Sequence, residues 1–263
     1  MSTKKKLLIA FGSVVALVAV VVASIAGTVA YMTSASKVSN VFTIGNVAIT
    51  LSESAVKPDG TYLTDASNRT DKNSYHLMPG KSYIKDPAIS VEDSTEPAYI
   101  FLVTRNQITA IEASAKNPVD GKPTMAEQMY TNGWAIYKDT SAGSRVWIYC
   151  GNKDRITGRY GDSNYEYTPM AVCGAGVTIP DGTTNVMKYS GTMIPIFEKF
   201  HIATTETTNF SIYAGAEVTI NAIGIQADSF GDYGASAAID AAWAAVVNQF
   251  PYIQDNLNGT ATN

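Results

Sequence analysis

The segment Glu217-Val-Thr-Ile-Asn-Ala-Ile-Gly-Ile-Gln226 is the clearest guide to the fold class of this chain. Its residues alternate as in a β-strand, where successive side chains point to opposite faces. Both faces carry apolar side chains, so we expect this strand to lie inside a sheet that is covered on both sides. One face contains Val218, Ile220, Ala222 and Gly224, and the other contains Ile223 and Ile225.

Strand-like segments recur along the chain before this one. Residues 98–107 are dense enough in apolar residues to form a second central strand. Shorter segments rich in Tyr, Trp, Val and Ile are separated by Gly and Asp or Asn turns, at a spacing typical of an all-β sandwich. We therefore predict a single antiparallel β-sandwich domain over residues 44–253. The shorter segments cover 134–138, 145–150, 165–172, 192–196 and 199–203.

Two regions interrupt this pattern. Between residues 108 and 130, Pro and Gly break the alternation and a short helix is predicted over 124–130, so we interpret 108–173 as an insertion. Residues 235–250 differ again, because apolar residues recur there every three to four positions in an Ala-rich background. This predicts an amphipathic helix that packs against the β-sandwich, followed by a flexible tail over 254–263. The apolar positions of the helix are Ile239, Trp243, Val246, Val247 and Phe250.

The first 30 residues have the pattern of an export signal. Lys4, Lys5 and Lys6 precede an apolar run that ends in Thr28-Val29-Ala30. A basic start favours the cytoplasmic side, and small residues after an apolar core suit a signal peptidase. We predict a signal peptide over 1–30, with a cleavage site formed by Thr28, Ala30 and Tyr31. The alternative is a permanent anchor, because about 24 residues at ~1.5 Å rise span a ~30 Å hydrocarbon core.

Residues 31–43 form a predicted extended N-terminal segment. Its first ten residues include no Pro and no Gly, so it can run extended without a partner inside its own domain. An extended peptide on an open sheet edge gains main-chain hydrogen bonds, and a head-to-tail contact of this kind propagates into a filament. A disordered tail is the alternative. The predicted assembly residues are Tyr31, Met32, Thr33, Ala35, Val38, Val41 and Phe42.

Charge and cysteine content limit the partners and the cross-links. Without residues 1–30 the chain has 16 basic and 23 acidic residues, which gives a net charge of −7. This excludes nucleic acid and anionic membrane surfaces as partners, and leaves the uncleaved N-terminal helix as the membrane contact. Cys150 and Cys173 have two alternatives. They form a disulfide that closes a loop of about 22 residues and adds ~3 kcal/mol, or they remain buried thiols.

No pattern of catalytic residues accompanies this fold. The two histidines, His76 and His201, lack the His-Glu-x-x-His spacing that places two zinc ligands on one helical face. A metal site would require the fold to join both histidines with a carboxylate such as Glu198. We therefore predict no catalytic residues, no metal site and no cofactor.

Several segments together resemble the TasA and camelysin family of Gram-positive exported proteins. They are the Lys-rich start and Gly27-Thr-Val-Ala-Tyr-Met32, the strand Asn40 to Leu51, Leu77-Met-Pro-Gly80, and Ala222 to Asp228. The resemblance implies a jelly-roll-like β-sandwich, processing by a signal peptidase of the SipW type, and assembly into extracellular fibres of the biofilm matrix. It also implies other matrix or surface proteins as partners.

We therefore predict a secreted structural protein at the cell surface that forms homo-oligomeric fibres by donating its N-terminal strand. One alternative is a camelysin-like surface metallopeptidase. The other is a monomeric adhesion or binding module whose region 108–173 meets a ligand, since aromatic side chains gathered there suit glycan stacking or protein contact. Those side chains are Trp134, Tyr137, Trp147, Tyr149, Tyr160, Tyr165 and Tyr167.

Overall fold

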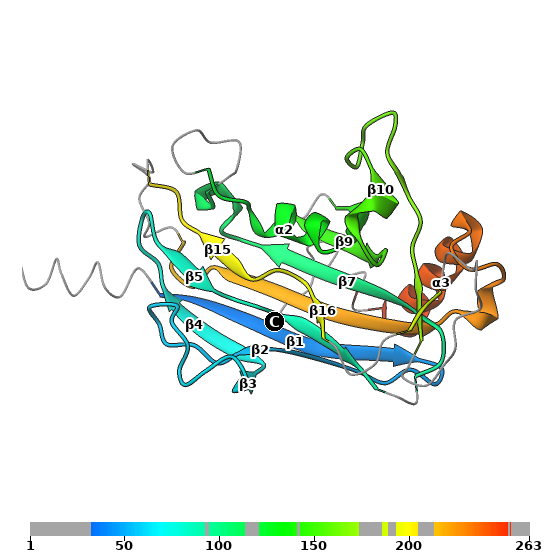
Figure 1. The fold of residues 1–263 in the computed structure, drawn as a ribbon, viewed down its shortest axis with the longest axis horizontal. Helices are drawn as coiled ribbons and strands as arrows, with labels where there is room; N and C mark the ends of the chain where they lie inside the picture. Colours follow the sequence, from blue (N-terminus) through cyan, green and yellow to red (C-terminus); the bar gives the residue numbers. More distant parts are fainter. Residues whose placement is uncertain are drawn as a thin grey trace, which may run out of the picture.

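The computed structural model describes residues 33–92, 95–113, 121–140, 143–173, 186–188, 193–204, 213–251 and 253. These residues form mainly β-strands in antiparallel sheets, with two α-helices among them (Figure 1). The all-β prediction is therefore confirmed at the level of fold class. The predicted signal peptide with Thr28, Ala30 and Tyr31, and the predicted tail over 254–263, lie outside the described residues. Neither described helix combines the length and apolarity needed to cross a membrane.

The main sheet is mixed but largely antiparallel, and the N-terminal strand lies near one of its edges. Two further strands extend it, with β9 (Ser144–Tyr149) beside β7 and β8 (Trp134–Asp139) beside β9. The order of the other strands is β13 (Val186–Lys188), β12 (Ala171–Cys173), β7 (Ala98–Asn106), β16 (Glu217–Gln226), β1 (Thr33–Ile44) and β4 (Lys72–His76).

A smaller sheet packs against one face of the main sheet, and two short strand pairs complete the β-structure. The smaller sheet has the order β14 (Ile194–Pro195), β6 (Ala88–Val91), β2 (Ile49–Ser54) and β3 (Arg69–Thr70). The short pairs are β5 (Ser82–Ile84) with β15 (Lys199–His201), and β10 (Ile156–Thr157) with β11 (Glu166–Tyr167). The helices are α2 (Met125–Thr131) and α3 (Ser236–Gln249).

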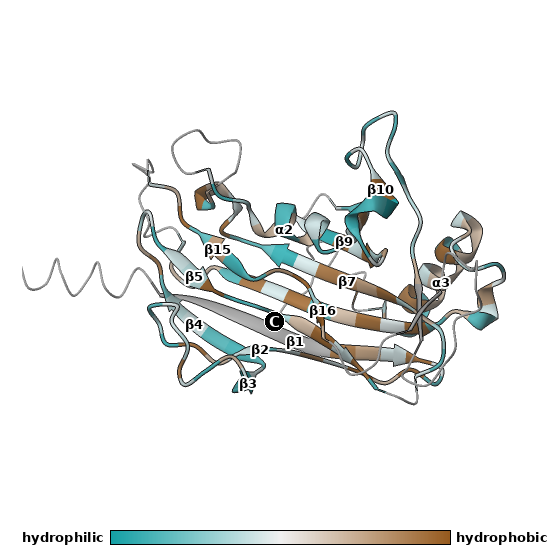
Figure 2. Cartoon of the chain, viewed as in Figure 1, coloured by the Kyte–Doolittle hydropathy of each residue, from teal (hydrophilic) through white to brown (hydrophobic). Residues whose placement is uncertain are grey.

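Strands β7 and β16 form the centre of the main sheet, as their sequences predict. They pair antiparallel, with Leu102 opposite Ala222. Even-numbered residues of both strands enter the core between the two sheets, whereas Phe101 and Ile223 enter a second core on the opposite face. Figure 2 shows apolar residues along much of β7 and β16, in contrast to the polar β4.

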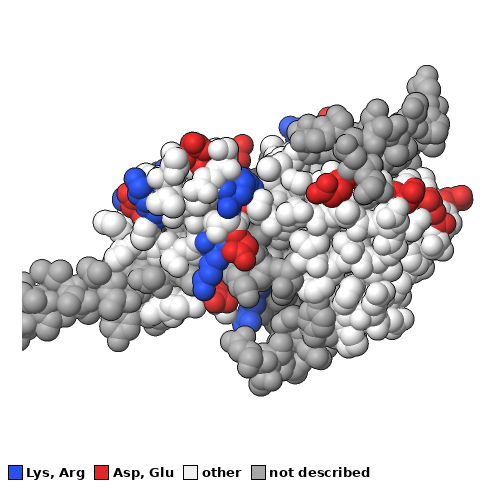
Figure 3. Space-filling model, turned by 90° about the horizontal axis from the view of Figure 1, so that it is seen from below, with Lys and Arg blue, Asp and Glu red and all other residues white. Residues whose placement is uncertain are grey.

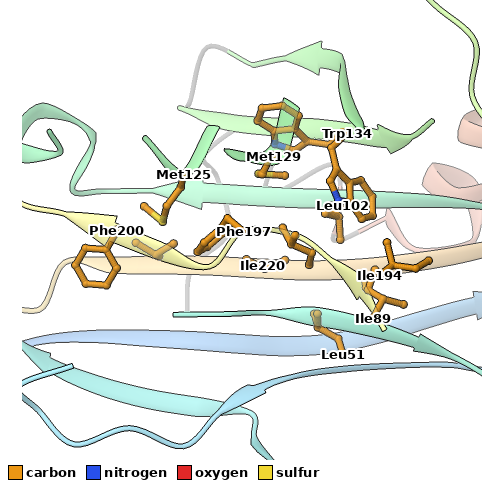
Figure 4. Packing of buried hydrophobic residues seen from close by; sticks show 14 of the residues in the cluster. Leu51, Ile89, Leu102, Met125, Met129, Trp134, Ile194, Phe197, Phe200 and Ile220 are labelled. Atoms are coloured by element: carbon orange, nitrogen blue, oxygen red, sulfur yellow. The ribbon is translucent and has the colours of Figure 1, made fainter. Parts of the chain in front are cut away.

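The core between the sheets also receives side chains from α2 and from region 108–173. Figure 4 shows Leu51 of the smaller sheet, Ile220 of the main sheet and Met129 of α2 in this core. Trp134 and Trp147 are buried there too, from β8 and β9. The region predicted as an insertion therefore contributes three strands of the main sheet, β8, β9 and β12, and the helix α2 to the body of the protein.

Helix α3 covers the second core, which confirms the amphipathic pattern of residues 235–250. Ile239, Trp243 and Val246 are buried against the main sheet. The Trp243 ring lies 5.2 Å from the Phe101 ring, measured between centroids. The main sheet is therefore enclosed on both faces, which explains why its central strands are apolar on both sides.

Candidate assembly site

The N-terminal strand β1 lies between β16 and β4 (Figure 1, dark blue). It runs parallel to β16, with Ala35 opposite Glu217 and Ile44 opposite Ile225, and antiparallel to β4. Our expectation that this segment lacks a partner inside its own domain is wrong. Its small and β-branched residues favour extended backbone, and two strand edges of its own chain satisfy its main-chain hydrogen-bonding groups.

The second half of β1 also has side-chain contacts on both faces of the sheet. A register shift separates Val38 from Val41, and beyond it the strand continues along β16. Val41 packs against the core between the sheets, whereas Phe42 and Ile44 pack against the core under α3. The half-buried Val41 and Phe42 therefore fix which face of the segment points to which core.

Strand β4 depends on β1 for its place in the main sheet. It is the last strand of the order, and its pairing with β1 extends from Thr33 opposite His76 to Lys37 opposite Lys72. Removal of β1 would leave the edge of β16 unpaired and would separate β4 from the sheet. The two strands thus form a slot that an extended peptide fills.

Gly45 ends β1 and permits the turn toward β2. Its φ is +80°, a conformation that L side chains rarely adopt, and a Cβ at this position would lie 2.5 Å from Gln226 Oε1. The Gln226 side chain accepts a hydrogen bond from the Asn46 backbone N–H at 3.3 Å. The chain therefore passes from β1 to β2 through a tight turn, which is the covalent connection between β1 and the described strands that follow.

The predicted assembly residues fall into three groups. Tyr31 and Met32 lie outside the described residues. Thr33, Ala35 and Val38 have their backbone in β1, whereas Val41 and Phe42 also have described side chains. The strand pairing itself joins residues far apart in the chain, and no local sequence pattern indicates it.

Of the two cysteines, predicted either to form a disulfide or to remain buried thiols, the structure describes the side chain of Cys150. Cys150 carries a free thiol that is buried at the end of β9, and burial raises its pKa to about 12. The Cys173 side chain lies outside the described residues, and for Cys150 the structure supports the second alternative, a buried thiol.

The two histidines and Glu198, which a metal site would have to bring together, lie in β15, in β4 and directly before β15. His201 Nδ1 lies 2.6 Å from Ser82 Oγ, and burial together with the charges of Lys122 and Lys199 lowers the pKa of this histidine. His76 ends β4, and Glu198 is exposed. Within the described parts of the chain, no group of three or more His, Cys, Asp and Glu residues could hold a metal ion.

A pocket of about 580 Å³ opens beside α2 on the core-facing side of the main sheet. Glu112 lies in its wall and accepts hydrogen bonds from the Met125 backbone N–H and, at 3.0 Å, from Asn106 Nδ2. Burial raises the pKa of Glu112 to about 7. These bonds join the start of α2 to the end of β7, so the carboxyl group has a structural role that sequence reasoning missed.

The aromatic side chains of region 108–173 serve mainly as core. Trp134, Trp147 and Tyr149 are buried, whereas Tyr160 is exposed. The Tyr165 hydroxyl donates a hydrogen bond to the Ile136 carbonyl at 2.7 Å, and its ring lies 5.4 Å from that of Tyr167.

On the face shown in Figure 3, basic side chains lie beside acidic ones, next to a broad area without charge.

Comparisons of this chain with protein-family models, with curated proteins and with solved structures find no match.

Proposed function

We propose that this chain is an exported structural protein that assembles into extracellular biofilm-matrix fibres at a Gram-positive cell surface. In this proposal, β1 leaves its own sheet and fills the same slot, between β16 and β4, in a neighbouring copy. The observation that carries the proposal is the position of β1: it is the first described strand, it pairs with β16 and β4, and the turn at Gly45 is its covalent connection to the described strands that follow.

Exchange of a terminal strand has a low thermodynamic cost. The strand makes the same pairs with β16 and β4 in either copy, so the pairing that one molecule gives up is restored in the next. A head-to-tail exchange does not close on itself, and therefore it propagates into a filament. Main-chain hydrogen bonds on both sides of the donated strand supply most of the interaction, as in other forms of strand addition.

Export sets the time of assembly. The predicted signal peptide holds the segment in the membrane until a signal peptidase of the SipW type cuts after Ala30, which frees Tyr31 as the new N-terminus. The proposed body is a jelly-roll-like β-sandwich, and other matrix or surface proteins are its partners. Two layers of strands around a shared core support this architecture.

Deletion of residues 31–40 from the secreted form tests the proposal. The deletion removes the part of β1 that pairs with β4 and leaves Val41 to Ile44 on β16. We expect a folded monomer that forms no fibres in negative-stain electron micrographs, whereas the intact secreted form polymerises. Fibres formed by the deletion variant would refute the proposal. N-terminal sequencing of the same sample shows whether Tyr31 is the first residue.

A cysteine pair distinguishes exchange from stacking of closed monomers. Val41 lies opposite Ala222, and both face the core between the sheets, so a Val41→Cys, Ala222→Cys variant can form a disulfide. Cys150→Ala and Cys173→Ala remove competing thiols. In monomers the bond closes within one chain. In exchanged fibres it joins neighbouring chains, and non-reducing electrophoresis shows a ladder. A single band from oxidised fibres would exclude exchange of β1.

A further inference from the structure

Three buried polar side chains meet at the edge of the core between the sheets. Glu53 and Lys85 have fully buried side chains, and Lys85 Nζ lies 2.6 Å from Glu53 Oε2. Asn73, which is 5 % exposed, donates a hydrogen bond from Nδ2 to Glu53 Oε1 at 2.9 Å. The two oxygens of one carboxylate thus hold an amine and a carboxamide side by side.

Strand alternation explains why these three side chains point inward. Glu53 follows Leu51 by two positions on β2, and Asn73 precedes Tyr75 by two on β4. Lys85 follows Tyr83 by two at the end of β5. Residues two apart share one face of a strand, so each of these polar side chains points to the same side as its buried apolar neighbour, toward the core.

The orientation of the Asn73 carboxamide follows from its partners. The Val56 backbone N–H donates to one terminal atom of the side chain at 2.9 Å, so that atom is the oxygen Oδ1. The other terminal atom donates to the Ser54 carbonyl at 2.8 Å, so it is the nitrogen Nδ2. The carbonyl is therefore polarised by a backbone donor, and the nitrogen lies against Glu53.

Stability alone gives a poor account of this cluster. Two charges taken from water lose hydration worth several kcal/mol each, and an apolar pair of similar volume is often as stable or more so. Tyr75 and Tyr83 stand two positions from Asn73 and Lys85 on their strands, and both pack against Phe200: the Tyr83 and Phe200 rings are stacked at 5.0 Å, and the Tyr75 ring is edge-on to both.

We propose that Lys85 and Asn73 form an intramolecular isopeptide bond, with Glu53 as the catalytic residue. Glu53 takes a proton from the Lys85 ammonium group, and the neutral Nζ attacks Asn73 Cγ to form the new C–N bond. Negative charge develops on Oδ1, where the Val56 N–H stabilises it. Glu53 then protonates Nδ2 and removes the second proton from Nζ. The carbonyl re-forms, the bond from Cγ to Nδ2 breaks, and ammonia leaves.

The geometry supplies what this reaction needs. Glu53 contacts both the attacking and the leaving nitrogen, so one carboxyl group serves as base and as acid. The fold holds the reacting groups together in a site from which water is excluded. The reaction therefore avoids the entropy cost of a bimolecular encounter. Atoms and charge balance without an oxidant or a cofactor. The product would tie the edge strand β4 covalently to the end of β5.

Intact mass spectrometry of the purified, folded full chain tests this inference. We expect a mass lower than the sequence mass by one ammonia. After trypsin digestion, a branched peptide should join the peptide that begins at Asn73 to the peptide that contains Lys85. A folded protein with its full sequence mass would overturn the proposal, whether or not the chain forms fibres.

Variants separate this bond from other losses of ammonia. Glu53→Gln and Lys85→Arg should restore the full mass, whereas an Asn73 succinimide, formed without the lysine, would persist in Lys85→Arg and overturn the proposal. Asn73→Asp should lose one water in place of ammonia, because the leaving group is then an oxygen. Lys81→Arg changes an exposed lysine nearby and should keep the ammonia loss. Urea unfolding of Asn73→Asp serves as the folding control. If this variant unfolds cooperatively and yet has its full sequence mass, the bond does not form in a folded protein and the proposal is wrong.

Discussion

The Phe42 ring of β1 contacts the Phe250 ring that follows α3, with centroids 5.0 Å apart and planes at 46°. The first described strand of the chain is thus held by a residue from its C-terminal helix region. If β1 passes to a neighbouring copy, this contact joins two molecules, so the pair reports on both folding and assembly.

Phe42→Ala should lower the free energy of unfolding of the monomer by about 1–3 kcal/mol, because the half-buried ring leaves a gap against α3. Urea unfolding followed by circular dichroism measures the change. Phe250→Ala and the double variant complete a cycle in which the two rings should be coupled by about 0.5–1.5 kcal/mol. Strictly additive losses would show that the rings do not stabilise each other.

Gly224→Ala should destabilise the contact between the two sheets. A Cβ at this position would lie 2.6 Å from Val47 Cγ1 and 3.3 Å from Ile49 Cδ1, and both side chains are buried. We expect a loss of about 1–3 kcal/mol in thermal or urea unfolding. Val47→Ala in the same chain opens space for the new methyl group, so the double variant should lose less than the sum of the two single changes. An additive double variant would contradict the steric explanation.

Glu112 should make the protein less stable as the pH rises from about 4.5 to about 7. Its pKa is raised from 4.5 to about 7 in the folded state, mainly by burial. The unfolded chain loses this proton first, so the free energy of unfolding falls across that interval and levels off above it. The fall amounts to at most roughly 3–4 kcal/mol at ~1.4 kcal/mol per pKa unit, and less where solvent enters the pocket.

The variant Glu112→Gln cannot titrate at this position. Urea unfolding of both proteins at several pH values between 4.5 and 8 isolates the contribution of the carboxyl group. The difference between the two proteins should change with pH up to about 7 and then stay constant. Parallel curves over the whole range would show that Glu112 titrates normally.

Cys150 should resist alkylation in the native protein at neutral pH, because its thiol is buried and its pKa is raised to about 12. In denaturant without reductant the same thiol should react with iodoacetamide, as mass spectrometry of the Cys150 peptide would show. A thiol that reacts only after reduction would establish that Cys150 forms a disulfide.

Local periodicity predicted much of the core. Alternation in 217–226 placed the Val218 face and the Ile223 face on opposite sides of the main sheet, and the structure confirms both. The three-to-four spacing in 235–250 predicted α3, which packs on the sheet through Trp243. These features depend on neighbours a few residues apart, so the sequence records them directly.

The buried cluster of Glu53, Asn73 and Lys85 left a signal that our reading of the sequence did not use. In Leu51-Ser-Glu53 and in Tyr83-Ile-Lys85, a charged residue takes the next inward position of an alternating strand. A charge at such a position is costly unless it meets a partner, so it indicates a buried contact without naming the partner.

The sequence by itself determined which segments are strands or helix and which of their faces are apolar, because those properties follow from the period of neighbouring residues. Only the tertiary structure decided that β1 pairs with β16 and that Lys85 meets Glu53. These contacts join residues far apart in the chain, and the order and register of strands depend on the packing of the whole sheet rather than on any one segment.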